Sequence, residues 1–256
     1  MDSRFGAQLA RVIPAVVGMS DAMQARWIGT QEYEDALSLQ RALHESRVAG
    51  DIPDTVLLLE HSRVITMGRR AVDSHVVSDA ATLAAAGLEL KETDRGGEAT
   101  YHGPGQLVVY PIVDLRGLGL GPVTYVAALE QAIIDTLSIY LVEAHQVSGR
   151  TGIWVDGDGV DPGEGKNPSG RKIAAIGVRI SRGVAMHGLA LNVSTDLSMF
   201  NHIVPCGMPG LDVTSIEAEQ GAAPPVRIVA RELAGKLGVA LGVRYDGAID
   251  VVTAPL

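Results

Sequence analysis

A single cysteine, Cys206, occurs in the 256 residues of the chain. One thiol cannot form an internal disulfide, so the cysteine usage gives no sign of an oxidising compartment. Apolar runs are also short, and none reaches the roughly 18 residues that a membrane-spanning helix needs. The apolar stretch at residues 9–19 is interrupted by Arg11 and Pro14 and lacks the long apolar region of a signal peptide. We therefore expect a cytoplasmic protein that does not bind membranes.

Basic residues are in the minority, with 21 Lys and Arg against 30 Asp and Glu, and the formal net charge is −9. This balance argues against non-specific binding of nucleic acid. Aromatic residues make up only 4% of the chain, so aliphatic side chains must fill most of the core. Because 46% of the residues are apolar, the chain lies far from the disordered range and can bury a sizeable core.

Apolar periodicity indicates more strands than helices along the chain. Helical spacing and helix-boundary residues predict helices over residues 31–47, 79–86, 122–143 and 225–241. Apolar runs of strand length predict strands over residues 55–60, 64–67, 88–93, 106–115, 152–156, 172–181 and 184–193. Because Arg182-Gly183 suits a hairpin between the last two strands, antiparallel pairing is favoured. We therefore predict an α/β (α+β) fold with mixed, largely antiparallel sheets flanked by helices.

One catalytic domain is expected, over residues 25–245. Residues 1–24 are expected to form an N-terminal extension, and residues 246–256 a C-terminal tail. Residues 157–170 consist mainly of Gly, Asp, Pro and Ser, which predicts an exposed loop inserted into the domain.

A glycine-rich segment runs from Arg95 to Gln106 and contains four glycines and a proline. A surface turn needs only one or two glycines, whereas several let the backbone approach a ligand and present N–H donors to it. The order of the glycines does not match a dinucleotide-binding fingerprint. We expect a binding loop whose candidate residues are Arg95, Gly96, Gly97, Glu98, Ala99, Thr100, Tyr101 and His102.

Two later strands combine polar residues with very small ones. Lys172 enters a strand of Ala, Ile and Gly, where it is either functional or an edge-strand lysine that blocks aggregation. In the next strand, alternation places His187, Leu189 and Leu191 on one face and Gly188 and Ala190 on the other. Faces of Gly and Ala leave space for a ligand chain. The alternative for His187 is a satisfied polar residue at a sheet edge.

Cys206 lies between Pro205 and Gly207, which favour a tight, irregular turn over the usual buried and inert thiol. A free thiol is mostly protonated at neutral pH, so a reactive one needs a positive neighbour. Lys172 is a candidate, although the sequence does not place the two residues together. The histidines and Cys206 lack the close spacing of zinc ligands, so no metal site is expected. Gly165-Lys166 does not belong to a phosphate-binding loop.

Taken together and in this order, the four segments resemble the lipoyl(octanoyl)transferase family. The matching motifs are RGG-x-x-T-x-HGPGQ, GRK-x-AAIG, HG-x-A-L-N and P-C-G, and the resemblance covers about residues 25–241. It implies the fold of biotin protein ligases and lipoate–protein ligases, with Cys206 and Lys172 as the catalytic pair. The implied acyl-binding residues are those of the glycine-rich loop together with Ala175, Ile176, Gly177, Gly188, Leu189 and Ala190.

The resemblance also implies the partners. The donor is octanoyl-acyl carrier protein, and the acceptors are the lipoyl domains of 2-oxoacid dehydrogenases and the glycine cleavage H protein. No cofactor and no metal is implied, and a monomer is expected. Because such partners are typically acidic, a basic rim is expected on this acidic chain. Its candidate residues are Arg69, Arg70, Arg95, Arg171, Arg179 and Arg182.

Two other functions remain open at this point. An ATP-dependent lipoate or biotin ligase of the same fold would not require Cys206. A non-catalytic protein that only binds acyl carrier or lipoyl domains would keep its activity in cells after Cys206→Ala. Transfer from a thioester donor without ATP separates the first alternative from the prediction, and loss of Cys206 separates the second.

Overall fold

Two β-sheets form the framework of the computed structural model, which describes residues 22–156 and 170–251. Within those residues the larger sheet has eight strands in the order β11-β1-β2-β6-β10-β9-β8-β7, and the smaller has the order β4-β3-β5. In chain order the strands are β1 (Met23–Gln31), β2 (Thr55–His61), β3 (Val64–Met67), β4 (Glu89–Glu92), β5 (Ala99–His102), β6 (Gln106–Ile112), β7 (Ala144–Val147), β8 (Arg150–Val155), β9 (Arg171–Ser181), β10 (Val184–Asn192) and β11 (Tyr245–Val251).

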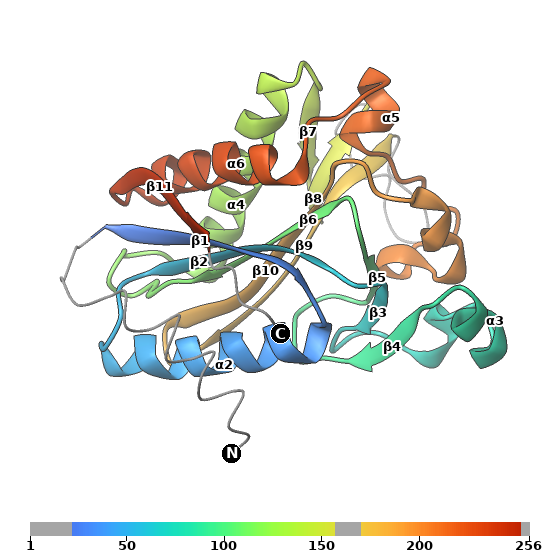
Figure 1. The fold of residues 1–256 in the computed structure, drawn as a ribbon, viewed down its shortest axis with the longest axis horizontal. Coiled ribbons are helices and arrows are strands. Elements are labelled where there is room, and N and C mark those ends of the chain that lie inside the picture. The colour runs from blue at the N-terminus through green and yellow to red at the C-terminus, as the bar shows by residue number, and fades with distance from the viewer. Residues whose placement is uncertain (1–21, 157–169, 252–256) are drawn as a thin grey trace.

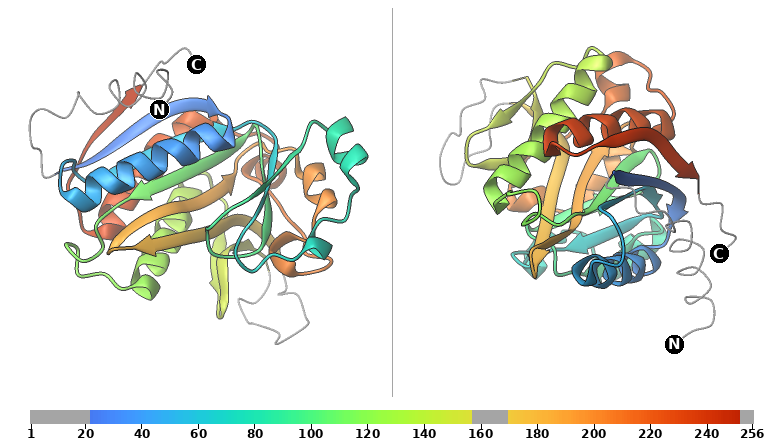
Figure 2. Two further views of the ribbon diagram at one scale, coloured as in Figure 1. Left: turned by 90° about the horizontal axis from the view of Figure 1, so that it is seen from below. Right: turned by 90° about the vertical axis from the view of Figure 1, so that its left-hand side faces the viewer.

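Helices cover both faces of the larger sheet (Figures 1 and 2). Helices α4 and α6 lie on one face and α2 on the other, and each side has its own apolar core. The helices are α2 (Tyr33–Ala49), α3 (Ala80–Ala85), α4 (Pro122–Ile139), α5 (Ile216–Gln220) and α6 (Val226–Leu241). In the larger sheet β1 pairs in parallel with β2 and β11, and the other pairs are antiparallel. The prediction of a mixed, largely antiparallel sheet flanked by helices is confirmed.

Strand β2 shows why its sequence is a continuous apolar run. Val56 and Leu58 belong to the core under α4 and α6, and Leu57 and Leu59 belong to the core under α2. Successive strand side chains point to opposite faces, so a strand with helices on both sides is apolar at every position. Burying each of these side chains contributes about 1.5–3 kcal/mol, which makes β2 a central element of the fold.

The small sheet holds the glycine-rich loop. Strand β5 lies inside the segment that was expected to be loop, and it pairs with β3 through Tyr101 and Ile65. The Tyr101 ring packs edge-on against Phe200, with 5.4 Å between ring centroids. The same apolar cluster contains Leu83 and Ile203, so segments that are far apart in the sequence contribute to it. This cluster fixes the small sheet against the segment that leads to Cys206.

The expected domain boundaries need correction at both ends. Strand β1 begins at Met23, inside the expected N-terminal extension of residues 1–24. Strand β11 continues to Val251, inside the expected tail of residues 246–256, and pairs in parallel with β1. A parallel edge strand with Gly247 and two aspartates has weak strand propensity, so only its tertiary pairing reveals it. Residues 1–21, 252–256 and all of the expected 157–170 loop except Gly170 lie outside the described residues.

Across residues 22–156 and 170–251, we find no helix with the length and apolar character to span a membrane.

Candidate active site

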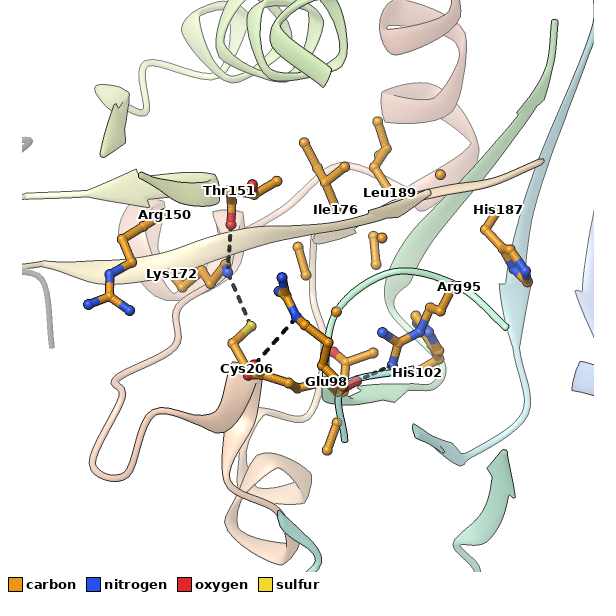
Figure 3. Close-up of a pocket in the computed structure, with 18 of the residues that line it drawn as sticks. Arg95, Glu98, His102, Arg150, Thr151, Lys172, Ile176, His187, Leu189 and Cys206 are labelled. Atoms are coloured by element: carbon orange, nitrogen blue, oxygen red, sulfur yellow. Dashed lines mark hydrogen bonds and ion pairs between the residues drawn. The ribbon is translucent and has the colours of Figure 1, made fainter. Parts of the chain in front are cut away.

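A cavity of about 220 Å³ lies between the small sheet, strands β9 and β10, and the Pro205–Gly207 turn (Figure 3). Among the residues that line it are those of the glycine-rich loop, β9, β10 and the turn: Arg95, Gly97, Glu98, Ala99, Thr100, His102, Lys172, Ala175, Ile176, Gly177, Gly188, Leu189, Ala190 and Cys206. The four motifs of the sequence therefore converge on one cavity, although they are far apart along the chain.

Lys172 and Cys206 face each other in this cavity. The ammonium of Lys172 donates to Cys206 Sγ at 3.1 Å and to the carbonyl oxygen of Thr151 at 2.9 Å. Figure 3 shows the Lys172 side chain pointing at the sulfur, with both contacts dashed. The two residues are 34 positions apart. The structure thus supplies the proximity that the sequence left open.

Backbone hydrogen bonds hold the Cys206 segment against β9. The Lys172 N–H donates to Asp212 O, and the Thr214 N–H donates to Lys172 O, both at 2.9 Å. On the other side of the turn, the Val204 N–H donates to His75 O at 2.8 Å. Cys206 itself has a φ of 56°, in the left-handed region that non-glycine residues rarely adopt. Anchors on both sides keep the thiol in this conformation, which directs it into the cavity.

Arg95 is an internal brace of the glycine-rich loop. Its guanidinium is buried and donates to Thr66 Oγ1, Thr66 O, Gly96 O and Glu98 O at 2.6–3.1 Å. Burial lowers the pKa of Arg95, and the nearby tyrosine and thiol groups oppose that shift. Its place in an expected basic rim is therefore wrong, because a buried guanidinium that bonds within the loop is not exposed to a partner protein.

Most of the other arginines expected at the rim lie beside carboxylates. The pairs are Arg70–Glu98, Arg171–Glu219, Arg179–Asp94 and Arg182–Glu45. Arg70 is the most exposed of these, with 74% of its side chain accessible, and it also lines the cavity. Arg69 is exposed and makes no ion pair with the residues that the structure describes. Of the exposed arginines in this set, Arg70 lines the cavity, and Arg69 precedes it in the chain.

Two of the expected acyl-binding residues do not line the cavity. Strand alternation turns Tyr101 away from Thr100 and His102, so its ring is buried against Phe200 instead. Gly96 donates its N–H to Val178 O at 3.1 Å and so joins the loop to β9. Both residues support the loop without facing the cavity.

Several residues that were not among the expected catalytic or acyl-binding residues also face the cavity: Tyr33, Tyr110, Gly149, Arg150, Thr151 and Met208. The Tyr33 hydroxyl donates to Thr93 Oγ1, and the Tyr110 hydroxyl lies 2.8 Å from His61 Nε2. In a chain with so few aromatics, a tyrosine in an otherwise aliphatic strand was a usable signal, since its hydroxyl needs a partner when buried.

The expected orientation of His187 is wrong. His187 has a φ of 56°, and its Nε2 lies 2.7 Å from Asp94 Oδ1, beside the Tyr110 ring. Leu189 belongs to the core on the other face of the sheet, under α4 and α6. Figure 3 shows Leu189 and His187 on opposite sides of the strands. The positive φ turns the histidine out of the regular alternation, which a period-two pattern cannot anticipate.

Burial makes the histidines around the cavity poor bases. It lowers the pKa of His61 to about 4, although a hydrogen bond to Gln31 O opposes the shift. It lowers the pKa of His102 well below the ordinary value, with the charge of Arg95 adding to the effect. The pKa of His187 is also lowered by burial, and Asp94 opposes that shift. These rings are therefore neutral hydrogen-bonding groups at neutral pH.

We expect the free energy of unfolding to fall as the pH is lowered from about 6.5 toward 4. In this window the unfolded chain binds a proton at each of these histidines, while His61 stays neutral until its pKa of about 4. For His61 alone the loss is on the order of 3 kcal/mol at the acidic end. Urea unfolding at several pH values should show that the free energy of unfolding depends less steeply on pH in His61→Gln than in the wild type. Equal slopes in the two proteins would contradict this assignment.

Among the described residues, no group of three or more His, Cys, Asp or Glu side chains is arranged to hold a metal ion.

Comparison with known proteins gives one family. Residues 32–238 match the lipoyl protein ligase A/B catalytic domain. An octanoyltransferase of Chloroflexus aggregans is 44% identical over 87% of this chain and 96% of its own length. An octanoyltransferase of Solibacter usitatus is 50% identical over 75% of this chain and 81% of its own length. An octanoyltransferase of Mycobacterium leprae is 45% identical over 86% of this chain and 88% of its own length.

Solved structures with the same fold are more distant in sequence. A lipoate protein ligase from T. acidophilum with bound lipoic acid has a TM-score of 0.61 at 15% identity, covering 91% of this chain and 90% of that one. Lipoate-protein ligase A bound with ATP has a TM-score of 0.59 at 18% identity, covering 90% of each chain. A biotin protein ligase from Aquifex aeolicus has a TM-score of 0.51 at 10% identity, covering 86% of this chain and 70% of that one. The predicted fold relationship to lipoate and biotin protein ligases is confirmed.

Proposed function

Because this chain belongs to the lipoyl protein ligase A/B catalytic-domain family and acts as an octanoyltransferase in protein lipoylation, we propose that it carries the octanoyl group as a thioester on Cys206. The observation that carries this proposal is the 3.1 Å contact between Lys172 Nζ and Cys206 Sγ inside the cavity. A cation at that distance stabilises a thiolate, which is the reactive form of cysteine.

The proposed donor is octanoyl-acyl carrier protein. The proposed acceptors are lipoyl domains of 2-oxoacid dehydrogenases and the glycine cleavage H protein. In support, one solved structure of similar fold is a bi-partite lipoate protein ligase from Thermoplasma acidophilum with its E2 lipoyl domain. We further propose that the chain works as a monomer in the cytoplasm, where its one thiol stays reduced.

In the first half-reaction the Cys206 thiolate attacks the thioester carbonyl of the donor. The new bond joins Sγ to the acyl carbon, and the bond from that carbon to the phosphopantetheine sulfur breaks. Lys172 donates a proton to the departing sulfur and becomes neutral. One thioester replaces another, so this step is close to energetic balance. The product is an octanoyl-enzyme with the acyl chain in the cavity.

In the second half-reaction the lysine amine of the acceptor attacks the acyl carbon. Neutral Lys172 takes a proton from that amine, and the Cys206 thiolate leaves beside the restored ammonium. The product is an amide, which is more stable than a thioester, so this step is effectively irreversible. The N–H groups of Gly207 and Met208 already donate to Val204 O and Pro205 O. The N–H groups of Gly97 and Glu98 are therefore the proposed oxyanion donors.

The acyl chain is proposed to lie along Ala175–Gly177 and Gly188–Ala190. Ile176 and Leu189 supply apolar surface, and the small residues beside them leave room for the chain. At Gly188 a Cβ atom would lie only 2.1 Å from Val109 O, so no larger residue fits there. A thioester is already activated, so the proposed chemistry uses neither a cofactor nor ATP.

An ATP-dependent ligase of the same fold is the alternative to exclude by assay. The purified protein should transfer octanoyl from its carrier protein to a lipoyl domain without ATP, and added ATP with free octanoate should give no further product. A requirement for ATP would reject the proposed function in favour of the ligase. A protein that only binds these partners would keep its cellular role in a Cys206→Ala strain, which we expect to lose lipoylation.

Arg69 and Arg70 are proposed to dock the acidic donor. Changing both to glutamate should weaken binding of octanoyl-carrier protein at least about tenfold at low salt, with a smaller difference at high salt. Arg227 and Arg231 are exposed on α6, away from the residues that line the cavity, so Arg227→Glu with Arg231→Glu is the matched control. Unchanged donor affinity in the Arg69 and Arg70 variant at low salt would reject this docking site.

A further inference from the structure

We propose that Trp154 and Glu130 are positioning residues that keep Lys172 charged and directed at Cys206, an inference that rests on the proposed acyl-enzyme function. Neither residue was singled out by the sequence motifs, and neither lines the cavity that holds the acyl chain. Trp154 comes from β8 and Glu130 from α4. Both act through Lys172, and they touch neither the substrate nor the reacting sulfur in this proposal.

Lys172 needs such support because it is buried, with only 6% of its surface exposed. Removing an ammonium from water strongly favours its neutral form unless protein groups replace the lost solvation. The ammonium has three N–H donors. Two of them contact Thr151 O and Cys206 Sγ, and one of these acceptors is neutral. Further groups around Nζ can therefore replace part of the solvation that the ammonium loses on burial.

Trp154 supplies one such group. The ammonium nitrogen of Lys172 lies 5.1 Å from the centroid of the Trp154 ring, within the range of a cation–π contact. The two residues face each other across the β8–β9 pairing, so the ring is fixed by the sheet. Trp154 is fully buried and packs with Met208 and Leu211, in the cluster that Cys206 also contacts. The packing of this cluster holds the Trp154 ring in place beside Lys172.

Glu130 supplies the second group. Its carboxylate accepts the Gly152 N–H at 3.0 Å, and Gly152 forms the wall against which the lysine side chain lies. Burial raises the pKa of Glu130, while the Gly152 hydrogen bond and the charge of Lys172 oppose that shift. The Gly152 peptide group lies between this carboxylate and the Lys172 side chain. A negative charge on that side favours the ammonium form.

Gly152 connects Glu130 to Lys172, because no side chain fits at its position and its backbone can pack directly on the lysine. A Cβ atom there would lie 2.5 Å from Lys172 Cε and 3.0 Å from Lys172 Nζ, and its φ is 118°. The backbone of residues 151–152 therefore packs directly on the lysine, with the Thr151 carbonyl accepting from Nζ. By holding the Gly152 N–H, Glu130 fixes the position of this carbonyl as well. Its effect on Lys172 is thus both electrostatic and geometric.

The test is the reactivity of Cys206 in the free enzyme, since it reports how well the ammonium stabilises the thiolate. Alkylation by iodoacetamide at pH 7 should slow about three- to tenfold in Glu130→Gln and in Trp154→Leu. Trp154→Phe keeps an aromatic face and should retain most of the wild-type rate. The kcat of transfer should fall by a similar factor, with the KM for the donor unchanged and the acid limb of the pH–rate profile moved to higher pH.

Glu130→Gln carries the test independently, because it keeps the shape of the side chain, whereas Trp154→Leu opens space in a packed core. Asp135→Asn on the same helix, where the side chain bonds only Gln131, is the matched control and should behave like the wild type. A wild-type alkylation rate and pH profile in Glu130→Gln would overturn the role of Glu130, and the same result in Trp154→Leu would overturn that of Trp154, while leaving the acyl-enzyme intact. Absence of an octanoyl adduct on the wild-type enzyme would instead overturn the proposed function.

Discussion

Replacing Cys206 with alanine should abolish octanoyl transfer, lowering kcat by at least about 10⁴-fold, because the variant has no atom that can carry the acyl group. The thiol lies 3.1 Å from Lys172 Nζ, and it is the only cysteine in the chain. No neighbouring thiol can replace it. The measurement is steady-state transfer from octanoyl-carrier protein to a purified lipoyl domain.

Cys206→Ser is the matched control for this prediction. Serine has nearly the same shape as cysteine, and it must adopt the same backbone φ of 56°. A hydroxyl beside Lys172 is a much weaker nucleophile than a thiolate, so we expect this variant to be nearly as inactive as the alanine variant. Circular dichroism and the unfolding midpoint should match the wild type in both. A fully active serine variant would contradict the mechanism.

Replacing Lys172 with methionine should lower kcat about 10³-fold. Methionine has a similar length and keeps the packing against Trp154 and Gly152, but it removes the charge that stabilises the thiolate and the proton that the leaving sulfur needs. Alkylation of Cys206 at neutral pH should slow in parallel. The measurements are the transfer rate and the rate of iodoacetamide labelling of the same preparation.

Lys172→Arg separates the two roles of the lysine. Arginine keeps a positive charge near Cys206 but does not give up its proton in proteins. We expect the arginine variant to retain more of the alkylation rate than the methionine variant, while transfer stays strongly reduced in both. Near-wild-type transfer by either variant would show that another group moves the protons.

The chain pattern predicted the central strands well because their signal is local. Strands β2 and β10 are buried along almost their whole length, so their apolar composition locates them. Strands β1, β5, β7 and β11 were not predicted. Glycines and aspartates lie in or beside β5 and β11, and the stability of these two strands comes from pairing with β3 and β1. Local sequence carries no information on those partners.

In the candidate site, too, the sequence predicted the local motifs but not the tertiary contacts between them. The motifs identified Cys206 and Lys172, but their contact depends on backbone bonds from residues 212–214 to Lys172, which no spacing rule predicts. Arg95 was expected both in the binding loop and at a basic rim that meets acidic partners, whereas the glycine-rich loop folds around its guanidinium. Trp154 was read only as part of a strand. Its role depends on the ring facing Lys172 across the sheet.

Intact-mass measurement of the enzyme mixed with octanoyl-carrier protein, without an acceptor, tests the central claim most directly. The wild-type enzyme should gain one octanoyl group, located on the peptide that contains Cys206, and should lose it when a lipoyl domain is added, at a rate no slower than overall turnover. Full-rate transfer with no octanoyl group on the enzyme, or with the group on any residue other than Cys206, would contradict the account.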